Sequence, residues 1–466
     1  MRPKELQSMG IPRGLPFEAA IAAAKEASRQ GYKKGNLRKA FSTALGDPQA
    51  YIHDPLFGEF ARAILAAGTQ KEQYVPRAES APCRIWGQDI ERGALTQMEN
   101  ACALPVSLRG ALMPDAHEGY GLPIGGVLGV KDAVIPFAVG MDIACRMCMS
   151  VLDLPLSALE RKTKRLESAL EKETGFGVGV SFKERQTHGV MDLDWSVSPV
   201  TAGNKDFAWA QLGTSGSGNH FVEFGELTLQ VPVGTLAPGT YLALLSHSGS
   251  RGTGAKLAEH YSTLARNLHA ELPKELIYLA WLPLASHEGQ EYWRAMELMG
   301  EYARANHEII HHRIARHVGS EILMRVENHH NYAWIEEHFG ESMVVHRKGA
   351  TPAGIGATGI IPGSMATAAY VVRGRGEPES LNSASHGAGR RMSRKAALSR
   401  FSAADAGRYL KNKGVKILSA GLDELPMAYK NIHEVMAAQE DLVETLGHFM
   451  PRIVKMAPSG PQFHSR

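Results

Sequence analysis

Apolar and polar residues follow helical spacing in several stretches of this chain. Residues 16–30 are rich in alanine and contain no internal breaker, which predicts a helix. Residues 156–172 combine an apolar stripe with a charged face, which predicts an amphipathic helix. The pattern over residues 288–327 predicts one long helix or a helix pair, and residues 431–448 predict a further helix.

Shorter apolar runs beside glycine and proline predict strands. They occupy residues 127–130, 133–139, 241–245 and 451–456, and another strand is expected to begin at Asn219. Loops at strand ends are where binding and catalytic residues gather. The glycine-rich turns that adjoin these runs are therefore the first places to look for chemistry.

The sequence pattern changes near residue 80, from helical spacing to stretches rich in glycine and proline with strand-like apolar runs. Residues 1–80 are expected to form a helical N-terminal extension, with a linker over residues 78–84, and residues 81–466 a catalytic domain. A basic cluster in the extension is interpreted as a solvated face rather than an RNA-facing patch. The cluster comprises Lys33, Lys34, Arg38 and Lys39.

Composition narrows the class of protein. The chain has 466 residues, of which 44% are apolar and 21% charged, as in soluble globular proteins. A net charge of +3 excludes a strongly polycationic protein but allows a local basic groove. There is no apolar run of about 18 residues and no secretory signal pattern at the N-terminus. Four scattered cysteines favour a reducing, cytoplasmic setting.

The most suggestive stretch spans residues 382–394, where His386 lies among small residues. Gly387 and Gly389 follow it, and glycine turns can aim several N–H groups at one anion. Arginine offers a planar fork that suits phosphate oxygens, and Arg390 and Arg391 come next. A histidine in such a loop can act as a nucleophile toward phosphorus. A glycine turn with a solvated basic edge is the alternative.

Several side chains suited to metal binding also adjoin predicted strands. A carboxylate and a thiolate three residues apart can share a metal site, and Asp142 and Cys145 have this spacing. Cys145 and Cys148 form a lone C-x-x-C, and a structural zinc site would need a second pair, whereas Cys83 and Cys102 are far apart in sequence. Cys148 is therefore interpreted as a buried apolar cysteine.

The glycine run over residues 212–218 resembles two phosphate-binding motifs but matches neither. No Gly-Lys-Ser/Thr follows, as a P-loop requires, and no helix opens after it, as a dinucleotide-binding turn requires. It leads instead into Asn219 and His220, and the loop after residue 245 similarly carries His247.

A formal metalloprotease motif occurs within the long predicted helix. His307 and His311 frame an H-E-x-x-H, and His317 stands where a third zinc ligand would be. The glycine that would turn the chain is replaced by Ile314. If the helix continues, His317 lies about 240° around the axis from His311 and cannot join the other two. We interpret these histidines as a solvated helix face.

Together the candidates form a mixed set of ligands. One Asp-x-x-Cys and three histidines in separate turns, His220, His247 and His330, suit Mn(II), Zn(II) or Co(II) in an open catalytic site. The arginine and glycine loops indicate a phosphate-rich ligand. The combination predicts metal-assisted phosphoryl or nucleotidyl transfer through a histidine.

Eight motifs in order make the chain resemble the RtcB family, whose members are GTP- and manganese-dependent RNA ligases. The resemblance runs from about residue 84 to residue 455. The motifs are Met113-Pro-Asp-Ala-His-Glu-Gly-Tyr-Gly, Gly140-Met-Asp-Ile-Ala-Cys, Leu212-Gly-Thr-Ser-Gly-Ser-Gly-Asn-His-Phe, His247-Ser-Gly-Ser-Arg-Gly, His330-Asn, His346-Arg-Lys-Gly-Ala, Ile361-Pro-Gly-Ser-Met and His386-Gly-Ala-Gly-Arg.

The resemblance implies a function and a set of site residues. RtcB ligases join RNA 3′-phosphate or 2′,3′-cyclic phosphate ends to 5′-hydroxyl ends, and His386 matches the histidine that becomes guanylylated. Two Mn(II) ions are implied, as is an α+β fold with a central mixed β core surrounded by helices. The implied metal ligands are Asp142, Cys145, His220, His247 and His330. The implied guanylate-contacting residues are Asn219, His220, Phe221, Val222, Glu223, His330, Asn331, Pro362, Gly363, Ser364, Met365, His386, Gly387, Ala388, Gly389, Arg390 and Lys455.

Three positions depart from the family pattern. Arg146 and Ala366 replace glycines that are usual there, and His307 stands where the family often has arginine. None of these changes removes an implied ligand or the nucleophile. Two other functions stay open: a transferase that guanylylates RNA ends but seals them poorly, and a catalytically silent RNA-repair accessory. An activating protein partner is neither indicated nor excluded.

Overall fold

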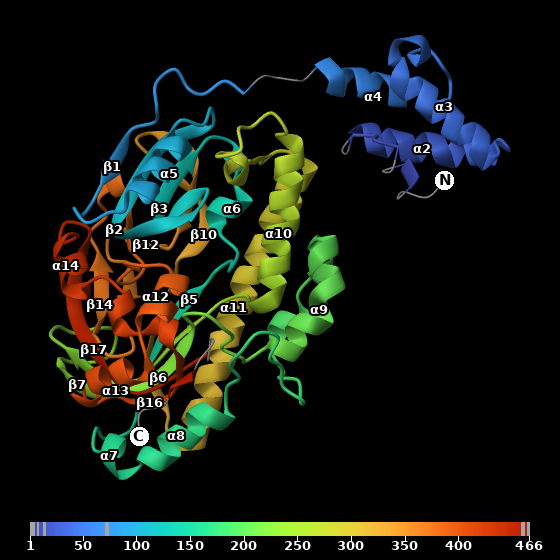
Figure 1. Cartoon of the computed structure of the whole chain (residues 1–466). Coiled ribbons are helices and arrows are strands. Elements are labelled where there is room, and N and C mark those ends of the chain that lie inside the picture. The colour runs from blue at the N-terminus through green and yellow to red at the C-terminus, as the bar shows by residue number, and fades with distance from the viewer. Residues whose placement is uncertain (1–4, 7–8, 13–14, 70–73, 458–461, 464–466) are drawn as a thin grey trace. The chain divides into compact units, whose positions relative to one another are not determined.

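The computed structural model describes residues 5–6, 9–12, 15–69, 74–457 and 462–463 (Figure 1). The chain divides into two compact units. The first comprises Met1–Val75 and Ala270–Pro273, and the second Pro76–His269 and Lys274–Arg466. Within the described residues, no helix has both the length and the apolar run that a membrane span needs.

The first unit is helical. It contains α2 (Leu15–Arg29), α3 (Lys34–Gly46), the 3-10 turn η1 (Pro48–Tyr51) and α4 (Gly58–Thr69). Its core is built around Phe41, whose ring meets those of Phe57 and Phe60 edge-on at centroid distances of 5.1 and 5.2 Å. The helix predicted over residues 16–30 is confirmed, and the four basic side chains near Gly35 are exposed.

The second unit is organised on two sheets. The larger has the strand order β13-β14-β17-β6-β7-β5-β9, and its neighbours along this order are antiparallel. A parallel strand, β16, extends it from β17. Its strands are β5 (Arg146–Leu152), β6 (Phe221–Leu229), β7 (Gly239–Ser248), β9 (Ile322–His329), β13 (Thr358–Ile361), β14 (Ala369–Gly374), β16 (Lys416–Gly421), β17 (Val443–Met456) and β18 (Gln462–Phe463).

The smaller sheet has the order β1-β2-β3-β11-β10, with β1 parallel to β2. His330 is the single residue between β9 of the larger sheet and β10 of the smaller, so the chain passes between sheets at a predicted site residue. The remaining strands are β1 (Cys83–Ile85), β2 (Ser107–Tyr120), β3 (Leu122–Val130), β4 (Ala133–Val134), β8 (Leu282–Pro283), β10 (Asn331–His338), β11 (Glu341–Lys348), β12 (Ala350–Pro352) and β15 (Ser383–Ser385).

Helices cover the larger sheet, and the longest of them is α11 (Figure 1). It contacts β5 and β7 and, with α8, encloses an apolar core. The helices of this unit are α5 (Arg92–Cys102), α6 (Pro136–Val139), α7 (Ala158–Arg161), α8 (Thr163–Lys172), α9 (Pro199–Gln211), α10 (Arg251–Leu268), α11 (His287–Val318), α12 (Arg394–Arg400), α13 (Ala403–Lys411) and α14 (Ile432–Ala437). Short 3-10 turns are η2 (Gly189–Asp192), η3 (Trp195–Val197), η4 (Ile277–Leu279), η5 (Pro378–Ser380), η6 (Leu422–Glu424) and η7 (Pro426–Ala428).

Side-chain alternation gives the larger sheet two different faces. Met147, Met149 and Leu245 point into one apolar core, whereas Leu152 and Leu244 point into the core beneath α11. Because alternate strand residues face opposite sides, neighbours in β5 and β7 enter separate environments. The active-site candidates and the α11 histidines are thereby kept on different faces.

The predicted α+β class and the helix at the start of residues 288–327 are confirmed, and the helix predicted over residues 156–172 forms as two helices, α7 and α8, interrupted at Lys162. Three predictions need correction. The long helix ends at Val318 and the chain continues as β9, while residues 133–139 turn at Pro136 into α6. The helix over residues 431–448 is wrong: only α14 forms, and residues from Val443 pair with two neighbours in the sheet.

The structure also bears on the predictions made for the cysteines and for the C-terminal tail. Cys83 and Cys102, far apart in sequence, lie side by side: a Cβ built on Gly110 would stand 3.3 and 2.7 Å from their sulfurs. All four cysteines are free thiols. The polar tail after Met456 falls largely on residues 458–461 and 464–466, which lie outside the described residues, while Gln462–Phe463 pairs with β16.

The core beneath α11 supplies a stability prediction. Phe224 on β6 is fully buried there, so Phe224→Ala should lower the free energy of unfolding by about 3–5 kcal/mol. Leu323→Ala is the control, because Leu323 is 44% exposed and its truncation should cost no more than about 0.5 kcal/mol. Urea denaturation followed by fluorescence measures both. Equal effects of the two changes would contradict this packing.

Candidate active site

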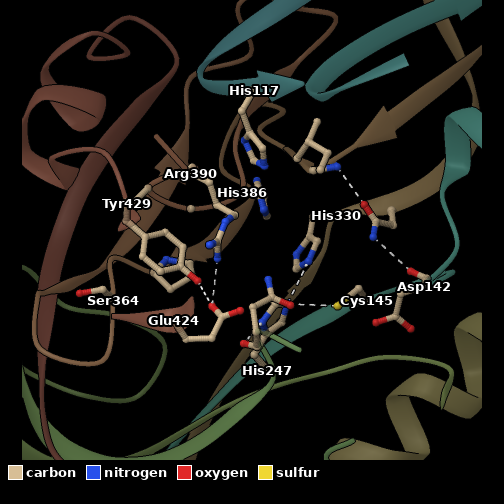
Figure 2. A pocket seen from close by; sticks show the side chains of 18 of the residues that line it. His117, Asp142, Cys145, His247, His330, Ser364, His386, Arg390, Glu424 and Tyr429 are labelled. Atoms are coloured by element: carbon tan, nitrogen blue, oxygen red, sulfur yellow. Dashed lines mark hydrogen bonds and ion pairs between the residues drawn. The ribbon is translucent and has the colours of Figure 1, made fainter. Parts of the chain in front are cut away.

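A cavity of about 410 Å³ opens between the two sheets, where β5 and β7 meet the turn between β9 and β10. Figure 2 shows His386 near His117 and His330, with Arg390, Tyr429 and Glu424 to one side. Most of the predicted site residues line this cavity. They are Asp142, Cys145, Asn219, Phe221, Glu223, His247, His330, Asn331, Pro362, Gly363, Ser364, Met365, His386, Gly387, Ala388, Gly389 and Arg390.

At the floor of the cavity the five predicted metal ligands converge. The Cys145 sulfur lies 3.0 Å from Nε2 of His247 and 3.4 Å from Nε2 of His220. Nε2 of His247 is 3.2 Å from Nε2 of His330, and Nε2 of His220 is 2.9 Å from Asp142 Oδ2. Two overlapping triads follow, Cys145–His247–His330 and Asp142–Cys145–His220, each with its ligand atoms within 4.8 Å of one another.

Main-chain carbonyls fix the orientation of two of these imidazoles. His247 Nδ1 lies 3.2 Å from the Asn219 carbonyl oxygen, and His220 Nδ1 lies 2.8 Å from that of Ser215. A carbonyl oxygen only accepts, so a neutral His247 ring carries its proton on Nδ1. The Nε2 lone pair of His247 is then directed at the Cys145 sulfur, an arrangement typical of metal-binding histidines. His220 has mixed contacts, because Arg251 lies 3.0 Å from its Nδ1 and can only donate, whereas Asp142 Oδ2 lies 2.9 Å from its Nε2 and accepts.

The electrostatics of this cluster favour a cation. Burial lowers the pKa of His247 to about 3, which keeps its ring uncharged. Burial would raise the pKa of Asp142, but its hydrogen bond to His220 and the charges of His220 and Arg251 lower it to about 2. Burial also raises the pKa of the Cys145 thiol, and a divalent cation would reverse this effect and yield a thiolate. The donors therefore fit a metal ion.

His386 follows β15 and is oriented by a buried carboxylate. Its Nδ1 lies 2.7 Å from Oδ2 of Asp115, which also accepts from the Gly387 N–H at 3.3 Å. Since the carboxylate only accepts, Nδ1 carries a proton, and the neutral ring has its lone pair on Nε2. The ring centroid is 5.0 Å from that of His330, so the candidate nucleophile adjoins the metal cluster.

Asp115 is a residue that the sequence analysis missed. It belongs to the Met113-Pro-Asp motif, is fully buried, and has one oxygen, Oδ1, without a hydrogen-bond partner. Nζ of Lys430 donates to the carbonyl oxygens of Pro114 and Ala116 at 3.1 and 2.9 Å, which holds the strand on both sides of Asp115. An aspartate two residues before a histidine within a glycine-rich motif was the available signal.

The loop after His386 packs against this same strand. Gly389 has φ +72°, and a Cβ there would lie 2.0 Å from the Asp115 carbonyl oxygen, so only glycine fits. Arg390 is already paired: it donates to the Asp423 carbonyl at 2.8 Å and lies 3.4 Å from Glu424. The Tyr429 hydroxyl donates to the same Glu424. Glu424 and Tyr429 line the cavity and were not predicted as site residues.

Three predicted site residues do not line the cavity. His220 lies beneath its floor, among the metal-ligand candidates. Val222 is fully buried in the core beneath α11, because it points to the opposite face of β6 from Phe221. Nζ of Lys455 lies 5.4 Å from the centre of the Phe176 ring. Resemblance alone supports the last two assignments.

Comparison with known protein families agrees with the ordered motifs. Residues 97–456 match the model of the family described as tRNA-splicing ligase RtcB. The chain belongs to the RtcB family. It is 34% identical over 413 residues to the RNA-splicing ligase RtcB of Escherichia coli (strain K12), covering 79% of this chain and 95% of that protein. It is 30% identical over 447 residues to the tRNA-splicing ligase RtcB of Methanococcus maripaludis, covering 80% of this chain and 92% of that protein.

The three departures from the RtcB pattern lie away from the cavity lining. Arg146 is buried in an ion pair with Glu327 at 3.0 Å, and Ala366 packs in the core beside α13. His307 and His311 are fully buried, so the interpretation as a solvated face is wrong. His317 pairs with Glu173 at 2.8 Å on the continuing helix, which confirms that it cannot join them.

Lys348 on β11 is a further residue of the cavity lining. Its Nζ donates to the Tyr120 carbonyl oxygen at 2.6 Å, and burial lowers the pKa of Lys348 to about 7. A lysine loses its positive charge as the pH rises through its pKa. The cavity should therefore attract anions more strongly below about pH 7 than above it.

This titration predicts pH-dependent anion binding. Sulfate keeps its charge near neutrality, so isothermal titration of the metal-free protein should show affinity falling about tenfold from about pH 6 to about pH 8.5. In Lys348→Arg the guanidinium stays charged, and the decline should largely disappear. An equally steep decline in Lys348→Arg would assign the effect to another group.

Proposed function

We propose that this chain is an RNA ligase that joins RNA 3′-phosphate or 2′,3′-cyclic phosphate ends to 5′-hydroxyl ends through a guanylylated His386. The observation that carries the proposal is the pairing of His386 with buried Asp115 beside the converging metal ligands. Membership of the RtcB family, whose matched relatives are named RNA- or tRNA-splicing ligases, supports it. Cytoplasmic localisation stays a prediction.

The hydrogen bond from His386 to Asp115 favours the tautomer that the first step needs. With Nδ1–H held by Asp115, the Nε2 lone pair can attack the α-phosphorus of GTP. A P–N bond forms as the bond to pyrophosphate breaks. The imidazolium that develops is stabilised by the adjacent carboxylate, as in other histidines paired with a buried aspartate.

Two transfers then complete the ligation. A 2′,3′-cyclic phosphate first needs hydrolysis, in which water adds to phosphorus and the bond to the 2′-oxygen breaks. An RNA 3′-phosphate oxygen then attacks the guanylate, so a P–O bond forms and the P–N bond to His386 breaks. The RNA 5′-hydroxyl next attacks the activated 3′-phosphorus, forms the phosphodiester and releases GMP. Each transfer returns the electron pair to the leaving group, and His386 regains its free Nε2.

Asp142, Cys145, His220, His247 and His330 would hold two Mn(II) ions. When bound, the ions would stabilise the negative charge that develops on the phosphates. The protein's own contribution is orientation, because the Asn219 carbonyl directs the His247 imidazole toward Cys145. The softness of a thiolate and the hardness of a carboxylate together suit such an ion.

The guanylate would occupy the cavity beside His386. We assign its contacts to Asn219, Phe221, Glu223, Asn331, residues 362–365 and residues 387–390, which line this space. Glu424 is added to this set, because it lines the same space, where Arg390, Arg394 and Tyr429 hold its carboxyl. A carboxyl so placed can accept from a purine's N–H groups.

The nucleophile can be tested directly by mass. After incubation with Mn(II) and GTP, the wild-type protein should gain one GMP, and His386→Ala should gain none. The matched control is His433→Ala, because His433 is an exposed histidine that bonds Tyr370 away from the cavity and should leave the adduct intact. Addition of EDTA should also abolish the adduct. A GMP adduct on His386→Ala would refute this assignment.

Asp115→Asn tests the positioning of His386. An amide can present its N–H to Nδ1 and favour the wrong tautomer, so adduct formation should slow by about 10²-fold or more. Asp115→Glu should restore part of the rate, and the pH profile of adduct formation should change in Asp115→Asn. An unchanged profile with a uniform loss of folded protein would instead indicate a structural role.

A further inference from the structure

A second cluster of metal-ligating side chains lies on the α11 face of the larger sheet. Cys148 of β5 and His307 and His311 of α11 are fully buried and place one ligand atom each within 4.8 Å of one another. Ser246 of β7 is the direct cross-strand neighbour of Cys148. Its hydroxyl lies 2.7 Å from His307 Nδ1 and 2.7 Å from His311 Nε2.

In both histidines, the ring nitrogen that faces away from Ser246 makes a hydrogen bond, as is usual for metal-binding histidines. Nε2 of His307 donates to the Ser248 carbonyl oxygen at 3.1 Å, which leaves a lone pair on Nδ1, facing Ser246. Nδ1 of His311 lies 2.7 Å from the Ser150 hydroxyl, which can accept its proton and free the Nε2 lone pair. Such outer hydrogen bonds fix the tautomer and orientation of ligating imidazoles.

The cysteine of this cluster adjoins a positive charge. Nε of Arg325 donates to the Cys148 sulfur at 3.0 Å, but burial outweighs this charge and raises the pKa of the thiol to about 11, so a bound cation would be needed to yield the thiolate. Arg325 is itself balanced by Glu308 and Glu327 at 3.7 and 3.8 Å. The surroundings can therefore accept a divalent cation with one thiolate and two neutral imidazoles, because charges of both signs already compensate there.

We propose that Cys148, His307 and His311 bind a structural zinc ion, separate from the metal cluster of the active site. One sulfur and two imidazole nitrogens form a ligand set that zinc prefers. An ion at about 2.0–2.1 Å from both nitrogens takes the space of the bridging Ser246 hydroxyl. Ser246 then turns aside or supplies the fourth ligand.

The site is closed rather than hydrolytic. In a metalloprotease, the glutamate of H-E-x-x-H activates a zinc-bound water. Here Glu308 pairs instead with His188 at 3.0 Å and with Arg325, on the outer side of α11. The ligand side chains are fully buried, as in structural zinc sites. The ion would join α11 to β5, the strand that Cys145 precedes, and so support the cavity floor.

The test uses the full-length chain with Cys145→Ala, which removes the thiolate of the active-site cluster. We expect this variant to retain one zinc per chain after dialysis against a weak chelator, measured by plasma mass spectrometry. Replacement by Co(II) should give sulfur-to-cobalt charge-transfer absorption. Adding Cys148→Ser or His311→Gln should lose the zinc, whereas adding Cys83→Ser, at an exposed thiol, should not.

Either outcome is decisive even if Cys148→Ser folds poorly. A folded Cys145→Ala protein without bound zinc and without the cobalt band would overturn the proposal and leave a metal-free hydrogen-bonded chain. Retention of the sulfur-to-cobalt band after Cys148→Ser is added to folded Cys145→Ala would also overturn it. The readout does not involve guanylylation, so failure here leaves the proposed ligase function untouched, and failure of the ligase leaves the zinc site untouched.

Discussion

The alternation of side chains along β5 and β7 is the constraint on which both clusters depend. Because successive residues leave a strand on opposite faces, Ser246 meets α11 while His247 enters the cavity. A slip of one residue in the pairing of these strands would exchange the two faces. The register in which Cys148 pairs with Ser246 is therefore as important to the site as any single ligand.

Burial sets the charge of the side chains that this register places on the cavity floor. The His247 and His330 imidazoles are held uncharged, since burial lowers the pKa of His247 to about 3 and that of His330 well below its usual value. The lone pair of His247 is directed at the Cys145 thiol, because the Asn219 carbonyl holds its other ring nitrogen. A site of this kind is prepared for a cation before any substrate arrives, and His386 adjoins it in the tautomer set by Asp115.

Local patterns in the sequence were sufficient for part of this account. The ordered motifs indicated the family, and the helix over residues 16–30 and the α+β class were predictable from spacing and composition. The strand that begins at Val443 was mistaken for a helix because it pairs with β14 and β6, far away in sequence. Long-range pairing overrides local propensity, and no local signal reports it.

The side chains that orient the reactive groups could not be predicted from local sequence patterns. Asp115 is 271 positions from His386, and only the fold brings them to 2.7 Å. Likewise the spacing of His307 and His311 showed that they share a helix face, but not that this face is buried against Ser246. Helical spacing defines a face, whereas the partner that covers it is decided by tertiary packing.

Two of the three departures from the RtcB motifs lie in the same part of the structure. Arg146 and His307 both lie outside the cavity lining, buried between the larger sheet and α11. Burial lowers the pKa of His307 well below its usual value, and the nearby positive charge of Arg146 adds to this effect. An uncharged His307 remains able to donate to the Ser248 carbonyl and to face Ser246 with a lone pair. These two departures from the RtcB motifs therefore lie in the layer behind the cavity and not in its lining.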